Sequence, residues 1–247
     1  MAWKTEAIIL KERQWRSADR WYDILTPQEG RLRVLLKSAG RSRSKLAGQL
    51  MPLNRVRLML GRGRQDHVAG ADILDSQTGL RQDLKTLILA EAVAELVLKV
   101  NVAGQAAGQE FRLVQTALAL LNDTHLTEAD KVAVVRIFLW KMLAAAGWTA
   151  ELEQCAICGR SLEQSAMGYL AGRGFVCLDH QPTVLALTPA LASFIKFLLK
   201  TDDWRLILAA RGGLAGQEVW GSLSQMYYQD IIEEPLHSLT VLKLINV

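Results

Sequence analysis

Short segments of alternating hydrophobic and polar residues occupy the first 75 positions of the chain. Each segment has a length and composition typical of a β-strand, and there are five of them, at residues 7–10, 21–26, 32–37, 56–60 and 68–74. The turn sequence Pro27-Gln28-Glu29-Gly30 separates the second from the third, because proline fixes φ and glycine readily adopts positive φ. Five short strands in so few residues predict a small β-barrel or sandwich.

After Leu80 the apolar period changes from that of a strand to that of a helix. A stripe at i, i+4, i+7 and i+11 predicts a helix over about 83–101, formed by Leu89, Val93, Leu96 and Val100. A second stripe follows at Phe111, Val114, Leu118 and Leu121. The remainder of the chain is therefore expected to be mainly helical.

A third helix is marked at both ends. Thr127 and Asp130 have the spacing of a capping box, and Gly147 is a plausible stop. This helix carries Arg136, Trp140 and Lys141 beside its apolar stripe. These three residues either decorate the solvent edge of a core helix or form a docking site for an acidic, hydrophobic peptide.

The last third of the chain predicts more helices. Thr188-Pro189 is a helix start, because proline is tolerated in the first turn, and an apolar stripe follows at Leu191, Phe194, Ile195 and Leu198. Gly212-Gly213 interrupts the chain, and Pro235 ends the next apolar run. The tail from His237 onwards is compatible with either a strand or a helix.

Positive charge is concentrated near the N-terminus. Residues 31–64 contain ten Lys or Arg and no Asp or Glu, and residues 1–64 contain 15 basic and five acidic side chains. Residues 65–247 contain 14 basic and 20 acidic side chains. A cationic segment of this density suits a polyanion such as a nucleic acid, since each Lys or Arg that meets a phosphate releases a counterion. The alternative is a solvated loop that is merely basic.

Aromatic residues interleave with this charge. Five strands and a basic face together favour an oligonucleotide-binding (OB) barrel, whose rings can stack on bases. Trp15 lies in a polar segment and is the candidate for stacking, although it could equally fill the core. Trp21 and Tyr22 are adjacent on a strand, so one of them faces inwards and the other outwards.

The three cysteines of the chain lie in two short motifs. Cys155 and Cys158 form a CxxC knuckle, and Cys177 and His180 repeat this spacing after 18 intervening residues. Such a set matches the four ligands of a tetrahedral Zn²⁺ ion, and four protein ligands predict a structural role because none is left open for substrate. A site without metal, or a fourth ligand from Asp179 or water, remains an alternative.

The longest apolar run near the centre, LILAEAVAELVL, contains Glu91 and Glu95, so no membrane span is expected. The N-terminus lacks the apolar length of a signal peptide. We therefore expect a cytoplasmic protein whose cysteines are thiols or metal ligands.

The chain resembles the RecO family of bacterial DNA repair proteins. The resemblance depends first on Thr26 and Gly30 before a strand and on the segment from Lys37 to Leu46 (KSAGRSRSKL). It depends also on the position of the CxxC motif in the chain and on the terminal sequence LTVLKLI. It implies an α+β protein with an N-terminal OB-fold barrel at 1–79 and an all-helical domain at 80–247, with a zinc ribbon inserted at about 153–182. Family members commonly have two CxxC pairs, so His180 is a departure.

The resemblance also implies a function without catalysis. Such proteins bind single- and double-stranded DNA, anneal complementary strands and, with RecR, help to load the RecA recombinase onto DNA coated by single-strand-binding protein (SSB). They also bind the C-terminal tail of SSB, for which Arg136 is the candidate here. The candidate DNA-binding residues are Trp15, Arg31, Arg33, Lys37, Arg41, Arg43, Lys45, Arg55 and Arg57.

The sequence leaves two alternative functions open. A zinc-dependent nuclease or other nucleic-acid-modifying enzyme has no support beyond the metal motif, because the sequence contains no HxE or HExxH motif and no Gly-rich phosphate loop. An RNA-binding OB protein is compatible with the composition.

Overall fold

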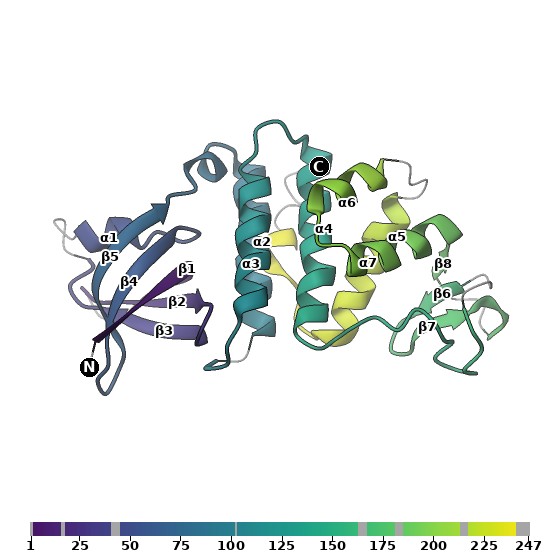
Figure 1. Ribbon diagram of the computed structural model, residues 1–247, viewed down its shortest axis with the longest axis horizontal. Coiled ribbons are helices and arrows are strands. Elements are labelled where there is room, and N and C mark those ends of the chain that lie inside the picture. Colours follow the sequence, from purple (N-terminus) through teal and green to yellow (C-terminus); the bar gives the residue numbers. More distant parts are fainter. Residues whose placement is uncertain are drawn as a thin grey trace. The chain divides into compact units, whose positions relative to one another are not determined.

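A computed structural model describes residues 2–15, 18–40, 45–101, 103–162, 167–180, 185–212 and 217–240 (Figure 1). The chain forms two compact units. The first comprises residues 1–131 together with 236–247, and the second comprises residues 132–235. The units are described one at a time below.

The first unit begins with a closed β-barrel. Its strands are β1 (Ala2–Gln14), β2 (Arg20–Thr26), β3 (Gly30–Leu36), β4 (Arg55–Gly61) and β5 (His67–Asp75). They follow the order β1-β2-β3-β5-β4, in which only the β3–β5 pair is parallel. The short helix α1 (Lys45–Gln49) lies between β3 and β4 in the chain. The predicted OB-type barrel and the α+β fold class are confirmed.

Every second side chain along the strands points inwards, and these side chains fill the barrel. Inward residues such as Ile9, Tyr22, Val34 and Leu58 are almost completely buried and pack into one cluster. Tyr22 faces inwards, whereas its neighbour Trp21 is partly exposed. Strand β1 is longer than the predicted apolar run, because its polar residues 11–14 extend the antiparallel pairing with β2 while remaining exposed.

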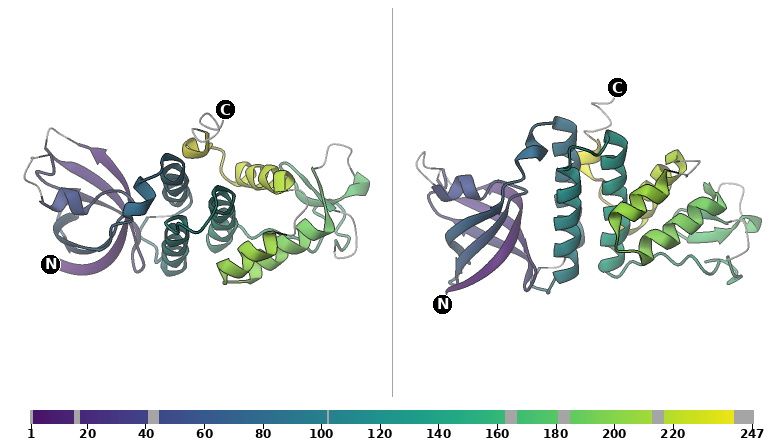
Figure 2. Two further views of the ribbon diagram at one scale, coloured as in Figure 1. Left: turned by 90° about the horizontal axis from the view of Figure 1, so that it is seen from above. Right: turned by 45° about the horizontal axis from the view of Figure 1, so that its top comes forward.

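Helices α2 (Leu84–Val100) and α3 (Gly108–Leu121) complete most of the first unit, after the 3₁₀ helix η1 (Thr78–Arg81). They lie side by side against the barrel, where α2 contacts β1 and α3 contacts β2 (Figure 2). Asp83 caps α2 by accepting a hydrogen bond of 2.8 Å from the Thr86 N–H. Residues 237–240 are helical, and residues 241–247 of the predicted terminal element lie outside the described part of the chain.

Helix α4 (Glu128–Ala145) has the predicted signals at both ends. The Thr127 hydroxyl and Asp130 carboxylate lie 2.6 Å apart, and the Asp130 N–H donates to Thr127 Oγ1, so the capping box is present. Gly147, with φ of 97°, follows the helix, and the Trp148 N–H donates to the carbonyl of Leu143. These bonds satisfy carbonyls that the helix end would otherwise leave exposed.

The second unit contains a small three-stranded sheet and three further helices. The sheet has the order β7-β6-β8 and consists of β6 (Met167–Leu170), β7 (Gly174–Cys177) and β8 (Leu185–Leu187). The 3₁₀ helix η2 (Leu178–His180) follows β7. The helices are α5 (Pro189–Lys200), α6 (Trp204–Arg211) and α7 (Gln217–Ile231). Strand β8 pairs with β6 but lies beyond residue 182, where the predicted zinc ribbon ends. The sheet is therefore larger than the ribbon predicted from the cysteine motifs.

The sheet is tied to α7 by one polar contact. The Tyr169 hydroxyl donates to Asp230 at 2.7 Å, and the Gly172 N–H donates to the same carboxylate oxygen at 2.8 Å. Burial of the ring, followed by its hydrogen bond to Asp230, raises the pKa of Tyr169. The phenol therefore stays protonated and acts as a permanent donor in this contact.

The predicted boundary between residues 79 and 80 stays a prediction, and the compact units divide elsewhere, with α2 and α3 in the same unit as the barrel. Among the helices that the structure describes, none combines the length and hydrophobicity needed to cross a membrane.

Candidate metal centre and nucleic-acid interface

The structure brings together the four side chains of the two knuckles. The ligand atoms of Cys155, Cys158, Cys177 and His180 all lie within 4.8 Å of one another. The sulfur atoms of Cys158 and Cys177 are 3.9 Å apart. Two thiolates bound to one tetrahedral Zn²⁺ would be separated by about 3.8 Å, given Zn–S bonds of about 2.3 Å. The cluster thus has the dimensions of a metal site.

The first knuckle is shaped by a tight turn. The Gly159 N–H donates to the carbonyl of Cys155 at 2.8 Å, and Gly159 has a φ of 71°, which favours glycine. The Cys155 sulfur accepts weak hydrogen bonds from the N–H groups of Ile157 and Cys177. Backbone donors of this kind stabilise a thiolate, the form that binds metal.

The pKa values of the thiols follow from these contacts. Burial alone would raise the pKa of Cys155, but hydrogen bonds from the backbone of Cys158, Cys177 and Ile157 lower it to about 6. Burial raises the pKa of Cys177, as does its proximity to Cys155 and Cys158. Cys155 therefore favours the thiolate while the same surroundings disfavour a second thiolate at Cys177, and a cation between the sulfur atoms would stabilise both charges.

The fourth position is occupied by the histidine. Its Nε2 atom is buried and has no hydrogen-bond partner among the described residues. A buried ring nitrogen without a partner is costly, and a metal ion is one way to satisfy it. The alternative ligand Asp179 accepts a hydrogen bond of 2.6 Å from Arg160 instead. The donor set Cys₃His therefore fits a metal ion.

Several of the candidate DNA-binding arginines on the barrel have acidic partners. Asp23 is buried on β2, and its two oxygens accept hydrogen bonds from Arg13 at 2.8 Å and from Arg33 at 2.7 Å. Burial opposes ionisation of Asp23, but these two guanidinium groups lower its pKa. Segment 31–64 has no acid of its own, yet neighbouring strands supply one.

The same compensation recurs along the barrel. Arg55 lies 3.6 Å from Glu6 on β1, and Arg62 lies 3.0 Å from Glu29 in the turn before β3. Basic residues of segment 31–64 are thus compensated by acids from outside the segment, because the barrel brings together residues that are distant in sequence.

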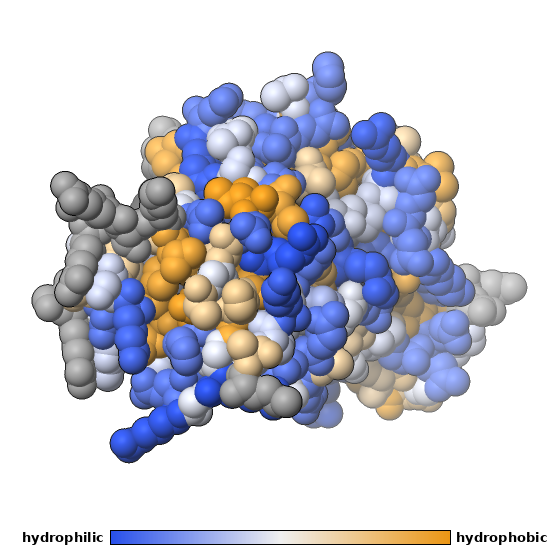
Figure 3. All heavy atoms as spheres, turned by 60° about the vertical axis from the view of Figure 1, so that its left-hand side comes forward, coloured by the Kyte–Doolittle hydropathy of each residue, from blue (hydrophilic) through white to orange (hydrophobic). Residues whose placement is uncertain are grey.

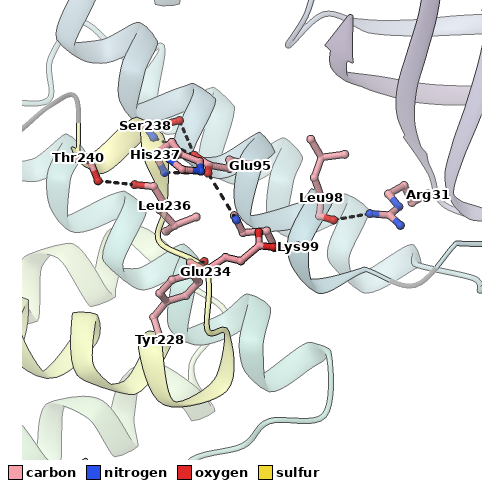
Figure 4. A network of polar contacts seen from close by, with 10 residues as sticks. All are labelled: Arg31, Glu95, Leu98, Lys99, Tyr228, Glu234, Leu236, His237, Ser238 and Thr240. Carbon is pink, nitrogen blue, oxygen red and sulfur yellow. Dashed lines mark hydrogen bonds and ion pairs between the residues drawn. The ribbon is translucent and has the colours of Figure 1, made fainter. Parts of the chain in front are cut away.

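The remaining candidate residues differ in their surroundings. Arg31 donates to the backbone carbonyl of Leu98 in α2, which gives its guanidinium a structural role (Figure 4). Lys37 and Arg57 are exposed. Arg41, Arg43 and the side chain of Lys45 lie outside the described residues.

Trp15 is 48% exposed at the end of β1. Its ring meets that of Trp21 edge to face, with centroids 6.2 Å apart. The Trp15 ring therefore packs against one neighbouring ring while about half of its own surface remains exposed, which is compatible with stacking on a base.

In the second unit, Arg136 lies over an aromatic ring. Its guanidinium carbon is 5.4 Å from the centroid of Trp220, and that ring meets Phe194 edge to face. Burial and the nearby charge of Arg211 both lower the pKa of Arg136. Gly221 permits this arrangement, because a Cβ there would lie 2.7 Å from an Arg136 nitrogen.

The other two polar or aromatic candidates on α4 are core residues. Trp140 is 1% exposed, donates to Ser224 and stacks on Tyr227. Lys141 is 6% exposed and donates to the carbonyl of Thr201 at 2.6 Å. Neither belongs to a solvent edge. Sequence reasoning missed the role of Asp23 and did not expect Lys141 to be buried, although in both cases one charged residue stands within an apolar run, WYDILT and FLWKML respectively.

The fold and the site define a class of protein: a chain with an OB-type barrel, a set of helices and a small sheet that bears a Cys₃His cluster. Comparison with known proteins gives the family. The model described as Recombination protein O N terminal matches residues 1–75, and the model described as Recombination protein O C terminal matches residues 81–240.

Curated relatives cover nearly the whole chain. The DNA repair protein RecO of Desulforudis audaxviator is 32% identical over 99% of this chain and 98% of its own. The RecO proteins of Geobacter metallireducens and Bifidobacterium animalis are 28% and 27% identical, with 97–98% of this chain and 98% of each relative aligned. The chain belongs to the RecO family, whose role is recombination in DNA repair. These comparisons name no catalytic activity.

Proposed function

We propose that this protein is a recombination mediator that binds single- and double-stranded DNA and anneals complementary strands. Together with RecR it loads RecA onto single strands coated by SSB, in the cytoplasm and at the nucleoid. The observation that supports this proposal is membership of the RecO family over nearly the full chain. Annealing needs no chemistry, since a cationic surface that holds two strands reduces their mutual repulsion.

The barrel is the proposed DNA-binding part. Exposed cations at Lys37 and Arg57, the segment from Arg41 to Lys45 and the half-exposed ring of Trp15 supply phosphate contacts and one stacking surface. Arg33 and Arg55 contribute less, because acidic neighbours already hold them.

Salt dependence tests this assignment. Each phosphate contact adds about 0.9 to the slope of log affinity against log salt concentration. We expect the combined change Arg41→Ala, Arg43→Ala and Lys45→Ala to reduce that slope by up to about 2.7. Lys85→Ala is the control, because Lys85 lies on α2 and pairs with Glu128. An unchanged slope in the triple variant would exclude the loop from the interface.

For the SSB tail, the proposed site is the surface around Arg136. Arg136 lies over the ring of Trp220, and a second guanidinium group, that of Arg211, lies close enough to lower the pKa of Arg136. Neighbouring cations suit the terminal carboxylate of such a peptide, while the rings of Trp220 and Phe194 are buried beneath Arg136.

A fluorescent SSB C-terminal peptide measures this directly. We expect Arg136→Ala to weaken binding by about tenfold or more, as loss of a charge-assisted contact does. Lys200→Ala, an exposed cation on α5, should leave peptide affinity unchanged. Equal affinity in the Arg136 variant and the wild type would exclude this pocket.

We further propose that the Cys₃His cluster holds a structural Zn²⁺. Cys155, Cys158, Cys177 and His180 would fill the four tetrahedral positions, so none is left for substrate. The ion pair between Arg160 and Asp179 joins the two knuckles beside the ligands.

A further inference from the structure

A pocket of about 410 Å³ opens on the outside of the barrel, where β1, β4 and β5 meet α1. Its lining includes Lys4, Gln49, Arg57, Met59, Gly70 and Asp72. Figure 3 views the molecule with the barrel turned towards the reader and shows hydrophobic residues gathered between hydrophilic ones on that face. The volume falls within the range of pockets that enclose small organic ligands.

Strand register explains why the pocket exists. Lys4, Met59 and Gly70 stand opposite one another on β1, β4 and β5, and Arg57 stands opposite Asp72 in the neighbouring row. Gly70 has no side chain, and a Cβ there would lie 3.7 Å from Met59 Cβ. The missing side chain leaves the floor open at the β5 end of a row whose other two members, Lys4 and Met59, are long.

The chemistry of the lining is that of an aromatic, polar ligand attached to an anion. Met59 is 39% exposed, and a thioether makes favourable contacts with aromatic rings. Gln49 Oε1 is buried without a hydrogen-bond partner among the described residues, and Asp72 is an exposed acceptor. Two cations, Lys4 and Arg57, outnumber that single carboxylate in the lining.

We propose that this pocket binds one unstacked nucleobase of a DNA strand. The ring lies on Met59 over the opening at Gly70, and an amino group of the base donates to Asp72 or Gln49. Lys4 and Arg57 contact the phosphates on either side. This inference rests on the proposed DNA binding and adds a hydrogen-bonded base contact to a surface otherwise described by its cations and the stacking ring of Trp15.

The test compares two oligonucleotides with the same backbone, a 12-nucleotide adenine strand and its fully abasic counterpart. One stacked and hydrogen-bonded base should make the adenine strand bind wild-type protein about tenfold more tightly. Gly70→Val fills the opening and should remove the part of that difference that the pocket supplies, about tenfold, while leaving the salt slope and stacking on Trp15 unchanged. Valine suits a strand, and the site has only ordinary contacts around a Cβ.

Ala69→Val is the matched control, because Ala69 is an exposed neighbour on β5 outside the pocket lining. Met59→Ala is a second variant that reduces the difference without adding bulk, and it keeps the test valid if Gly70→Val does not fold. Equal wild-type affinity for the two strands would overturn the pocket assignment and leave DNA binding intact. Absence of binding to both strands would instead overturn the proposed function.

A further arm separates a base within a strand from a free nucleotide. Deoxyadenosine monophosphate should bind wild-type protein far more weakly than the adenine strand, because it lacks the neighbouring phosphates. A mononucleotide that binds as tightly as the strand would overturn the inference.

Discussion

At the scale of single residues, Asp23 shapes the basic face of the barrel most strongly. Its carboxylate is almost completely buried, whereas the side chains of its partners Arg13 and Arg33 are 45% and 56% exposed. A buried carboxylate is stable only when charged donors satisfy it, and here two of them do. The same contacts hold two guanidinium groups on the barrel surface in fixed positions.

Replacing Asp23 with Asn tests this dual role. We expect the free energy of unfolding to fall by roughly 1.5–3 kcal/mol, because charge-assisted hydrogen bonds are lost. DNA affinity at low salt should rise and the salt slope should steepen, since both arginines become available to phosphates. Thermal unfolding and fluorescence anisotropy measure the two effects.

Glu12→Gln is the comparison, because it removes an exposed ion pair with Arg20 and should cost less than about 1 kcal/mol. If Asp23→Asn changes stability but not the salt slope, then Arg13 and Arg33 lie away from bound DNA.

What could be predicted at this scale depended on how local the interaction is. The capping box of Thr127 and Asp130 and the CxxC knuckle are set by spacing within a few residues, and both arrangements occur in the structure. The contact of Asp23 with Arg33 depends on strand register, which joins residues that no short motif links. The pocket at Gly70 was missed for the same reason, because its lining comes from three strands and a helix.

At the scale of elements, the most informative contact joins α2 to the C-terminal segment. The Glu95 carboxylate accepts hydrogen bonds from the N–H groups of His237 and Ser238 and from the Ser238 hydroxyl, at 2.8–3.0 Å (Figure 4). These donors lie at the start of the helical residues 237–240. Glu95 thus caps a helix that is distant in sequence, where negative charge is favourable.

The contact should depend on pH. Burial opposes ionisation of Glu95, but the hydrogen bonds from Ser238 and His237 and the charge of Lys99 lower its pKa below the ordinary value of 4.5. A carboxylate with a lowered folded-state pKa stabilises the protein fully above the unfolded-state pKa. That contribution is lost as pH falls through the folded-state value.

We therefore expect Glu95→Gln to destabilise the protein by roughly 1–3 kcal/mol at pH 7 and to have almost no effect once the wild-type carboxylate is itself protonated. Thermal unfolding of both proteins between pH 7 and pH 2.5 gives the difference. Glu91→Gln is the control, because Glu91 is exposed on the same helix. A difference that does not shrink at low pH would show that geometry rather than charge holds the segment.

Element boundaries followed the hydrophobic pattern where that pattern was strong. Helices α2, α3 and α5 lie where the apolar stripes predict them. The pattern failed for β1, because an exposed strand end carries no apolar signal, and for β8, whose three residues are too few to show a period. The tail from His237 was ambiguous, and a cap from α2 makes its first residues helical.

At the scale of the whole molecule, the division into two compact units separates the proposed roles. The barrel belongs to the first unit, while the Cys₃His cluster and Arg136 belong to the second. Each unit has a buried core of its own, with residues such as Ile24 and Leu58 in the first and Phe138 and Trp220 in the second. Loss of order in the small sheet should therefore leave the barrel folded.

Removal of the proposed zinc tests this independence. A chelator should release one Zn²⁺ per chain and expose residues 153–180 to protease, because metal binding and folding are coupled in small sites. The Tyr169 ring, whose hydroxyl holds the sheet to Asp230 on α7, should become exposed to solvent at the same time. DNA binding by the barrel should keep its affinity and salt slope.

Cys155→Ser should reproduce the effect without chelator, whereas Ser161→Ala should not. A protein that loses zinc yet remains protease-resistant would show that the cluster is not structural, and loss of DNA binding would show that the units are not independent.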